Sequence, residues 1–233
     1  MAFRVTIVTL YPELFPGPLC YSLSGRALEK GLWGLETVFI RDYAFDKHRQ
    51  VDDTPYGGGA GMVMRADVVA RALDATCCDI PRIFLSPQGR PFSQADARRF
   101  ASGKGITVLC GHFEGVDARL LEARDIEEVS IGDYVLSGGE IAAFPLIDSI
   151  VRLLPSVMGN AFSHEEESFE NGLLEYPHYT RPRVFEGLEV PEILLSGNHA
   201  LIKEWRQAQS EQRTRMRRPD LYARYLAKKQ KTP

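Results

Sequence analysis

The chain has 233 residues, enough for one large α/β domain or for a medium domain and a small helical one. Hydrophobic residues make up 44% of it and charged residues 25%, with a formal net charge of −3, which is typical of a globular protein. No apolar run reaches the roughly 18 residues of a transmembrane helix, which excludes a membrane-spanning helical protein. A secretory signal has a basic region, an apolar stretch and a small-residue cleavage site, and residues 1–8 do not begin one. We therefore expect a cytoplasmic protein with no membrane partner.

Apolar, β-rich runs indicate strands at residues 5–10, 35–40, 82–85, 106–110 and 128–131. Helical patterns alternate with them at residues 22–32, 66–75 and 93–102, with Ser93 as the N-cap of the third. The longest apolar helix is predicted at residues 139–154, and Pro155 ends it. This alternation predicts an α/β fold with a parallel sheet.

The composition and the apolar patterning of the sequence change after Pro155. Residues 156–180 are acidic and have little apolar periodicity, and short basic helices are predicted beyond them at 191–195, 200–209 and 220–229, with no further strand. Residues 201–233 contain ten Lys or Arg against three acids, a local net charge of +7. We therefore expect an α/β domain at residues 1–158, a flexible linker at 159–176 and a small, basic helical domain at 177–233.

The cysteines Cys20, Cys77, Cys78 and Cys110 have neither the C-x-x-C spacing of a zinc site nor the density of a disulfide framework. We expect all four to be reduced and structural, and we expect no bound metal.

Four segments combine glycine with polar residues, and three of them follow predicted strands: residues 55–62, 86–91, 111–117 and 130–140. Ligands of open α/β sheets bind beyond the carboxyl ends of the strands, where glycine lets the backbone approach a ligand closely. Each segment alone is more commonly an ordinary turn. No P-loop motif occurs, and residues 57–64 do not fit the dinucleotide-binding pattern, which disfavours a P-loop NTPase or a Rossmann dehydrogenase. The first strand also leads into Tyr11-Pro12-Glu13 and not into a glycine fingerprint, which disfavours an ordinary Rossmann-like methyltransferase.

Five strings occur in order along the chain: V-D-D-T-P-Y-G-G-G-A-G-M-V, L-S-P-Q-G-R, G-H-F-E-G-V-D, S-I-G-D-Y-V-L-S-G-G-E and P-H-Y-T-R-P. Together they closely resemble the bacterial tRNA (guanine-37, nitrogen-1) methyltransferases, the TrmD family of the SPOUT superfamily, over essentially the whole chain. The resemblance implies an α/β fold of SPOUT type, a parallel sheet with a deep trefoil knot, plus a small C-terminal helical domain. It also implies a homodimer with a composite active site, which transfers a methyl group from S-adenosylmethionine to guanosine 37 of tRNA.

The resemblance implies that three loops bind the methyl donor. The residues concerned are Leu85, Ser86, Pro87, Gly89, Gly111, Glu114, Ser130, Ile131, Gly132, Tyr134, Leu136, Gly138 and Gly139. The family often has Arg-Tyr where this chain has His112 and Phe113, and a proline near Ala142, which leaves individual donor contacts open there. By its residue type alone, His112 is more commonly a structural histidine than a catalyst, and Glu114 is as easily a packed or capping residue as a ligand.

Nitrogen-1 of guanine carries a proton at neutral pH and is a poor nucleophile, so its methylation needs a base for that proton or a cation near oxygen-6. The resemblance assigns the base to Glu167 and the cation to Arg152. The family commonly has aspartate where this chain has Glu167, and Glu165 and Glu166 stand beside it, so the assignment could move by one residue. Apart from the resemblance, the three acids fit a solvated linker face and Arg152 fits a surface arginine near a helix end.

The basic C-terminal segment fits an RNA-binding surface, although it equally fits a solubilising tail. Its cations are Arg213, Arg215, Arg217, Arg218, Arg224, Lys228, Lys229 and Lys231, with Tyr222 and Tyr225 among them. The resemblance places Asp52, Gly61, Glu175, His178 and Arg181 around the target guanine and its neighbour.

Two other functions stay open: a non-catalytic RNA-binding protein of the same fold, and a knotted methyltransferase with a different RNA target. A Mg²⁺ requirement of the reaction also stays open.

Overall fold

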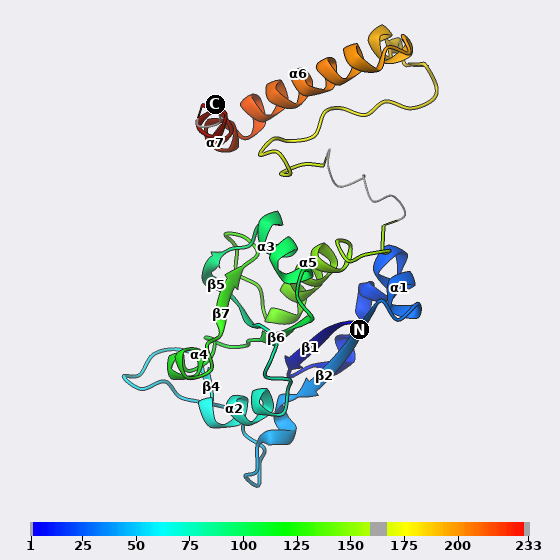
Figure 1. Ribbon diagram of the computed structural model, residues 1–233. Coiled ribbons are helices and arrows are strands. Elements are labelled where there is room, and N and C mark those ends of the chain that lie inside the picture. The colour runs from blue at the N-terminus through cyan, green and yellow to red at the C-terminus, as the bar shows by residue number, and fades with distance from the viewer. Residues whose placement is uncertain (1, 159–166, 231–233) are drawn as a thin grey trace. The chain divides into compact units, whose positions relative to one another are not determined.

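The computed structural model describes residues 2–158 and 167–230, and the chain forms two compact units, Met1–Gly159 and Asn160–Pro233. The first unit contains a five-stranded sheet with the strand order β2-β1-β6-β5-β7 (Figure 1). Its strands are β1 (Phe3–Thr9), β2 (Trp33–Phe39), β5 (Arg82–Pro91), β6 (Gly105–Cys110) and β7 (Glu127–Ser130). Every pairing between them is parallel. The parallel α/β sheet predicted from the sequence is therefore confirmed.

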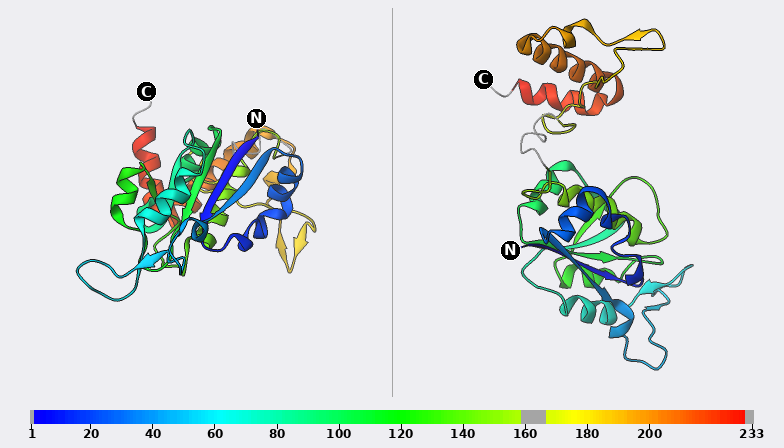
Figure 2. Two further views of the ribbon diagram at one scale, coloured as in Figure 1. Left: turned by 90° about the horizontal axis from the view of Figure 1, so that it is seen from below. Right: turned by 90° about the vertical axis from the view of Figure 1, so that its right-hand side faces the viewer.

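Helices cover both faces of this sheet, as the two further views show (Figure 2). They are α1 (Ser22–Glu29), α2 (Ala66–Asp74), α3 (Gln94–Ala101), α4 (Ala118–Ala123) and α5 (Gly139–Val151). One buried cluster joins the sheet to α1, α3 and α5, and a second joins it to α2 and α4. The central strand β6 is buried along its whole length, with Val108 in the first cluster and Leu109 in the second. Burial on both faces explains its continuous apolar sequence.

Two helix ends differ from the prediction. Helix α5 ends at Val151, before the predicted end at residue 154, and the chain continues in turns up to Pro155. Helix α1 ends at Glu29, because Gly31 adopts a positive φ of 66° that terminates the helix. The N-cap predicted at Ser93 is confirmed, since its hydroxyl accepts the Asp96 N–H and the Asp96 carboxylate accepts the Ser93 N–H.

Short elements complete the first unit. They are the 3₁₀ helices η1 (Pro12–Leu14), η2 (Gly17–Cys20) and η3 (Ile40–Tyr43) and the antiparallel pair β3 (Asp52–Asp53) and β4 (Val63–Met64).

The cysteines differ in burial. Cys110 is buried in β6, which supports the structural role that we expect for it, whereas Cys20 and Cys78 are exposed and gain no such support.

Strand β5 contains the irregularity that matters most for the site. Leu85 and Arg90 are both in register with Val129 of β7, so residues 86–89 loop out between them. A Cβ atom on Gly89 would lie 2.4 Å from the Val129 backbone nitrogen. Glycine therefore lets the end of this loop return close to β7.

The second unit contains β8 (Val184–Phe185), β9 (Leu188–Glu189), η4 (Glu192–Leu195), α6 (His199–Arg217) and α7 (Pro219–Lys229). The expectation of no further strand was wrong, because β8 and β9 form a hairpin whose turn places Glu186 and Gly187 at positive φ. Both strands have only two residues and are exposed, so they produce no hydrophobic alternation in the sequence. Helix α6 extends beyond its predicted end at residue 209 to Arg217.

Residues 159–166 of the predicted linker lie outside the described residues. Residues 167–173 form turns and bends in which Leu173 is buried, and the Leu174 N–H that follows donates to the Thr214 hydroxyl of α6 at 2.8 Å. Within the part of the chain that the structure describes, no helix is long and apolar enough to cross a membrane.

Candidate active site

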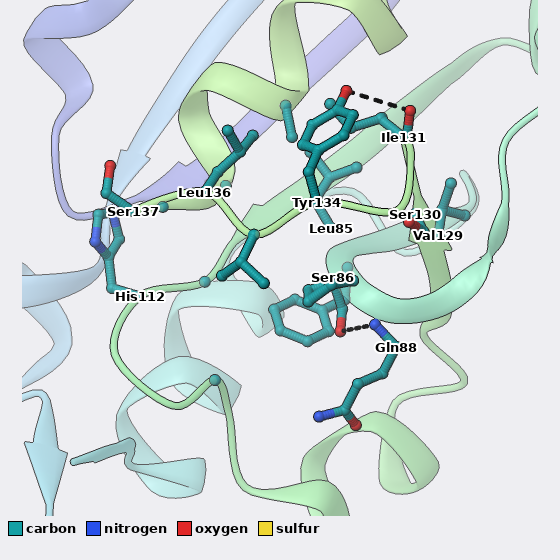
Figure 3. Close-up of a pocket in the computed structure, with 18 of the residues that line it drawn as sticks. Leu85, Ser86, Gln88, His112, Val129, Ser130, Ile131, Tyr134, Leu136 and Ser137 are labelled. Atoms are coloured by element: carbon teal, nitrogen blue, oxygen red, sulfur yellow. Dashed lines mark hydrogen bonds between the residues drawn. The ribbon is translucent and has the colours of Figure 1, made fainter. Parts of the chain in front are cut away.

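A cavity of about 290 Å³ lies beside the loop inside β5 and at the carboxyl ends of β6 and β7, and is called the loop cavity below (Figure 3). Three segments enclose it: the loop at 86–89 inside β5, residues 111–115 after β6, and residues 130–139 between β7 and α5. In the view of Figure 3, His112 and Ser137 are seen on one side of it, and Ser86 and Gln88 on another. Parallel strands place these ends together, so segments far apart in the sequence form one site.

Every predicted donor residue except Gly89 lines the loop cavity. Gly89 instead packs against the backbone of β7, as described above. Residues that line the cavity but were not predicted include Gln88, His112, Phe113, Val135 and Ser137. Their position within the quoted motifs is the signal that could have identified them.

Glycines form a wall of the loop cavity where side chains would not fit. A Cβ atom on Gly139 would lie 2.7 Å from Cys110 Cα, and one on Gly111 would lie 2.5 Å from Phe84 Cε2. At Gly138 an added Cβ would lie 2.3 Å from His112 Cε1. Real Cβ atoms do not approach heavy atoms this closely, so glycine at these positions lets the segments around the loop cavity pack together.

Behind this wall lies a buried carboxylate that the sequence did not single out. Glu140, at the start of α5, is 2% exposed. Its Oε1 accepts the Thr9 hydroxyl at 2.5 Å, and its Oε2 lies 2.7 Å from His112 Nε2. Burial and the nearby Glu140 charge raise the pKa of the Cys110 thiol, so that thiol stays protonated at neutral pH. Glu140 thus connects β1, α5 and the loop after β6.

The segment that contains Asp52 and Gly61 docks on the loop after β6. Asp52 in β3 pairs with Met64, whose N–H donates to Gly115 O at 2.9 Å. The Glu114 N–H donates to Met62 O at 2.9 Å, and a Cβ on Gly61 would lie 2.4 Å from Glu114 Oε1. Two predicted RNA-binding residues therefore belong to a segment that contacts the cavity loop.

The two predicted catalytic residues lie in different units. Arg152 directly follows α5 in the first unit, and its backbone N–H donates to Asp148 O. Glu167 lies in the second unit and lines a cavity of about 470 Å³ with Tyr176, Lys203 and Arg206. The Arg206 guanidinium lies 4.7 Å from the centroid of the Tyr176 ring. The assignment of Arg152 and Glu167 to one site stays a prediction.

The remaining predicted RNA residues all lie in the second unit. His178 Nε2 lies 2.8 Å from Glu175 Oε1, and the His178 ring packs 4.9 Å from the Tyr176 ring. Arg181 is exposed in the same segment. Arg215 and Arg217 are exposed in the last turn of α6 and form no ion pair with a residue that the structure describes. These two cations are available to an anionic partner.

Tyr222 and Tyr225, which we expected among the RNA-binding cations, stack on each other with ring centroids 6.2 Å apart. The Tyr225 hydroxyl donates to Glu211 at 2.8 Å, and burial together with this carboxylate raises the Tyr225 pKa. Tyr225 thereby joins α7 to α6.

Across residues 2–158 and 167–230, no group of three or more His, Cys, Asp or Glu side chains is arranged to hold a metal ion.

A parallel sheet with a glycine-walled cavity near the carboxyl ends of its strands is typical of α/β proteins that bind small ligands. A family model described as tRNA (Guanine-1)-methyltransferase TrmD matches residues 3–224. A Bartonella tribocorum protein is 65% identical over 232 residues, covering 100% of each chain. A Mesorhizobium japonicum protein is 63% identical, covering 95% of this chain and 97% of its own, and a Zymomonas mobilis protein is 61% identical, covering 96% and 91%. All three are named tRNA (guanine-N(1)-)-methyltransferase. The chain belongs to this TrmD methyltransferase family.

Proposed function

We propose that this protein transfers a methyl group from S-adenosylmethionine to nitrogen-1 of guanosine 37 in tRNA. Membership of the TrmD family supports the reaction, because relatives of equal length and high identity are named for it. The observation that carries the proposal is the convergence of three glycine-containing segments on the loop cavity. They are the segments that the resemblance assigns to the methyl donor.

The residues of the loop cavity fit an adenosyl group. Leu85, Ile131 and Leu136 offer apolar contacts for a planar base, and Ser86, Gln88 and Ser130 add polar groups to the lining. The bound donor supplies an electrophilic methyl group on a sulfonium. The chain's own task is to hold this group in line with the accepting nitrogen, because orientation lowers the barrier of a transfer between two bound reactants.

Glu167 is the proposed base for the proton on guanine nitrogen-1, and the Arg152 guanidinium is the proposed partner of oxygen-6. Loss of the proton places negative charge on the guanine ring, which a fixed cation near oxygen-6 stabilises. A positioned base contributes roughly 10² to 10⁴ in rate. Arg152 directly follows α5, whose first residues form the glycine wall, so this helix links the donor cavity to the proposed cation.

The proposed tRNA-binding surface comprises Arg215 and Arg217 of α6 together with Asp52, Gly61, Glu175, His178 and Arg181. The exposed arginines contact phosphates and orient the substrate, while the other groups form hydrogen bonds near the target base. The docking of residues 61–64 on the loop at 111–115 supports this division, since it connects a predicted base-contacting segment with the donor cavity.

From the family resemblance we also propose a deep trefoil knot in the first unit, a homodimer whose active site contains residues from both subunits, and a cytoplasmic location. The helical second unit is the proposed tRNA-binding domain.

A radiolabelled methyl-transfer assay tests the proposed function. Purified protein, S-adenosylmethionine and a tRNA with guanosine 37 should yield labelled RNA, whereas the same tRNA with adenosine 37 should stay unlabelled. Mapping of the labelled nucleotide should identify 1-methylguanosine. Binding of the guanosine 37 tRNA without any incorporation would favour the non-catalytic RNA-binding protein, and a label at another nucleotide would favour a methyltransferase with a different target.

A further inference from the structure

The strongest feature not used by the proposed mechanism is the buried group formed by Thr9, His112 and Glu140. A carboxylate that is 2% exposed in an apolar core needs partners for both oxygens, because an unpaired buried charge is strongly unfavourable. Thr9 and His112 provide them. His112 also lines the loop cavity, so this buried group reaches a residue that a ligand can touch.

The hydrogen bonds around Glu140 determine where the protons lie. The Thr9 oxygen accepts the Tyr11 N–H at 2.9 Å, so its own hydrogen points to Glu140 Oε1 at 2.5 Å. Glu140 Oε2 then accepts from His112 Nε2 at 2.7 Å. A neutral imidazole that donates through Nε2 has an unprotonated Nδ1, which is an acceptor.

The His112 ring is also held sterically. The centroid of the Tyr11 ring lies 5.0 Å from that of the His112 ring. On the loop before α5, Gly138 lies so close that an added Cβ atom would clash with His112 Cε1 and Glu140 Oε2. Within residues 2–158 and 167–230, no group is hydrogen-bonded to His112 Nδ1. In the neutral imidazole, this nitrogen is the unused acceptor of an otherwise fixed ring.

The charge of the cavity lining indicates what this acceptor binds. Among the described residues that line the loop cavity, His112 and Glu114 are the ones that carry an imidazole or a carboxylate, and they are two positions apart. The rest of the lining is glycine, apolar or uncharged polar. An adenosyl group fits the uncharged lining, whereas a cationic amine fits the imidazole acceptor and the carboxylate of these two residues.

We propose that Glu140 is a positioning residue that fixes the tautomer of His112, so that His112 Nδ1 accepts a hydrogen bond from the ammonium group of the methyl donor. The inference rests on the proposed function, because it assumes that the loop cavity holds S-adenosylmethionine. A purely structural role is the alternative: the same contacts would then only clamp the loop at 111–115 to α5.

Two substitutions of one residue distinguish these roles. His112→Gln places an amide near the Nε2 position, so it keeps a donor for Glu140 and loses the acceptor at Nδ1. His112→Asn places an amide oxygen near the Nδ1 position and cannot reach Glu140. Donor recognition through Nδ1 therefore predicts that the glutamine variant binds the donor poorly and the asparagine variant binds it well. A clamp predicts the reverse order.

Glu140→Gln provides an independent variant. Its amide oxygen can accept the Thr9 hydroxyl while its NH₂ group donates to His112 Nε2, which transfers the ring hydrogen to Nδ1. The side chains stay linked, but the ring now presents a donor to an ammonium group. The same logic makes a wrong histidine tautomer costly in catalytic triads.

Calorimetry with S-adenosylmethionine and 5′-methylthioadenosine, which lacks the amino-acid portion, tests the proposal on the full chain, with thermal unfolding as a control for folding. His112→Gln and Glu140→Gln should weaken S-adenosylmethionine binding by about tenfold or more, the effect of losing a charge-assisted hydrogen bond. Their affinity for 5′-methylthioadenosine should stay within about threefold of wild type, and His112→Asn should bind S-adenosylmethionine more tightly than His112→Gln.

Parallel losses for both ligands in His112→Gln and Glu140→Gln would overturn the proposal, and so would weaker S-adenosylmethionine binding by His112→Asn than by His112→Gln. Wild-type protein that binds neither ligand would instead remove the proposed donor site itself, and this inference with it. The two failures are therefore distinguishable.

Discussion

Glu167 is the residue on which the proposed chemistry depends most. Replacing its carboxylate with an amide in Glu167→Gln removes a base but retains size and much of the hydrogen bonding. We expect methyl transfer to slow by at least about tenfold while donor binding is nearly unchanged, because a base acts in the transition state and not in donor binding. Single-turnover transfer and donor calorimetry on the same preparation measure the two effects.

Glu166→Gln is the matched control for Glu167→Gln, since it removes one negative charge from the adjacent position. It should transfer methyl groups at nearly the wild-type rate. If Glu166→Gln were slow and Glu167→Gln were normal, the base would be the neighbouring residue.

The sequence indicated which segments line the loop cavity, but it did not single out Glu140. Two of the glycine motifs directly follow strands, so the positions of Gly111, Gly138 and Gly139 beside the loop cavity follow from local pattern together with sheet topology. Glu140 bonds to Thr9 and His112 across 131 and 28 positions of the sequence. No local pattern indicates such partners, and only the folded chain brings them together.

At the scale of elements, an ion-pair cluster joins β5, α3 and β7. Arg90 at the end of β5 lies 2.7 Å from Asp96 and also pairs with Glu127, which Arg99 contacts at 2.8 Å. The Arg90 guanidinium, together with the Ser93 hydroxyl and backbone, lowers the Asp96 pKa to about 2. This cluster fixes Arg90 at the point where the chain pairs with β7 again after the loop at 86–89.

The lowered Asp96 pKa gives this cluster a defined pH dependence. The carboxyl is depressed in the folded state, so its contribution to stability is complete above the unfolded pKa near 4 and disappears as the pH falls toward 2. Asp96→Asn should therefore lower the free energy of unfolding by about 1 kcal/mol at pH 7 after allowance for solvent screening, and by progressively less below pH 4. Urea unfolding across this pH range measures the difference.

Ser93→Ala is the control for Asp96→Asn. It removes the capping hydroxyl, which costs about 1 kcal/mol, but it keeps the Arg90–Asp96 pair. Because the Ser93 hydroxyl also helps to lower the Asp96 pKa, the pH dependence of Ser93→Ala should be smaller than that of the wild type but should persist. A stability difference between wild type and Asp96→Asn that did not change with pH would contradict the role of this ion pair.

Helix α6 carries the two cations of the proposed RNA surface. Arg215→Gln combined with Arg217→Gln should weaken tRNA binding and reduce the slope of log affinity against log salt concentration by about 1.4 to 1.8, if each arginine contacts one phosphate. Filter binding at several salt concentrations measures both quantities. The control Arg218→Gln removes the same charge from a residue already paired with Asp220 at 2.7 Å, so its effect should be smaller. An unchanged slope in the double variant would exclude these phosphate contacts.

Element prediction succeeded where hydrophobic periodicity was long and failed where it was short. The strands of the parallel sheet were found because they are apolar on both faces, as in β6. The β8–β9 hairpin and the last two turns of α6 were missed because they are short or polar, and the Glu186-Gly187 turn was the single available signal. The looping out of residues 86–89 from β5 depends on pairing with β7, which the local sequence does not encode.

At the scale of the whole molecule, the composite active site of the proposed homodimer predicts complementation between inactive chains. Arg152→Ala and Glu167→Ala should each be inactive alone. If Arg152 of one subunit acts with Glu167 of the other, a mixed dimer retains one intact site. Co-expression in equal amounts should then restore about a quarter of wild-type activity, since half of the dimers are mixed and each has one active site of two. Mixed dimers without activity would place both residues in the same subunit's site.

The most direct test of the account is calorimetric titration of the intact protein with S-adenosylmethionine. Gly139→Ala and Gly34→Ala are matched control variants, because an added methyl would lie 2.7 Å from Cys110 Cα in the first and would meet no atom within 4 Å in the second. The account predicts saturable donor binding that the demethylated product displaces, with binding reduced in Gly139→Ala and retained in Gly34→Ala. Absence of heat from both the donor and its demethylated product would contradict it.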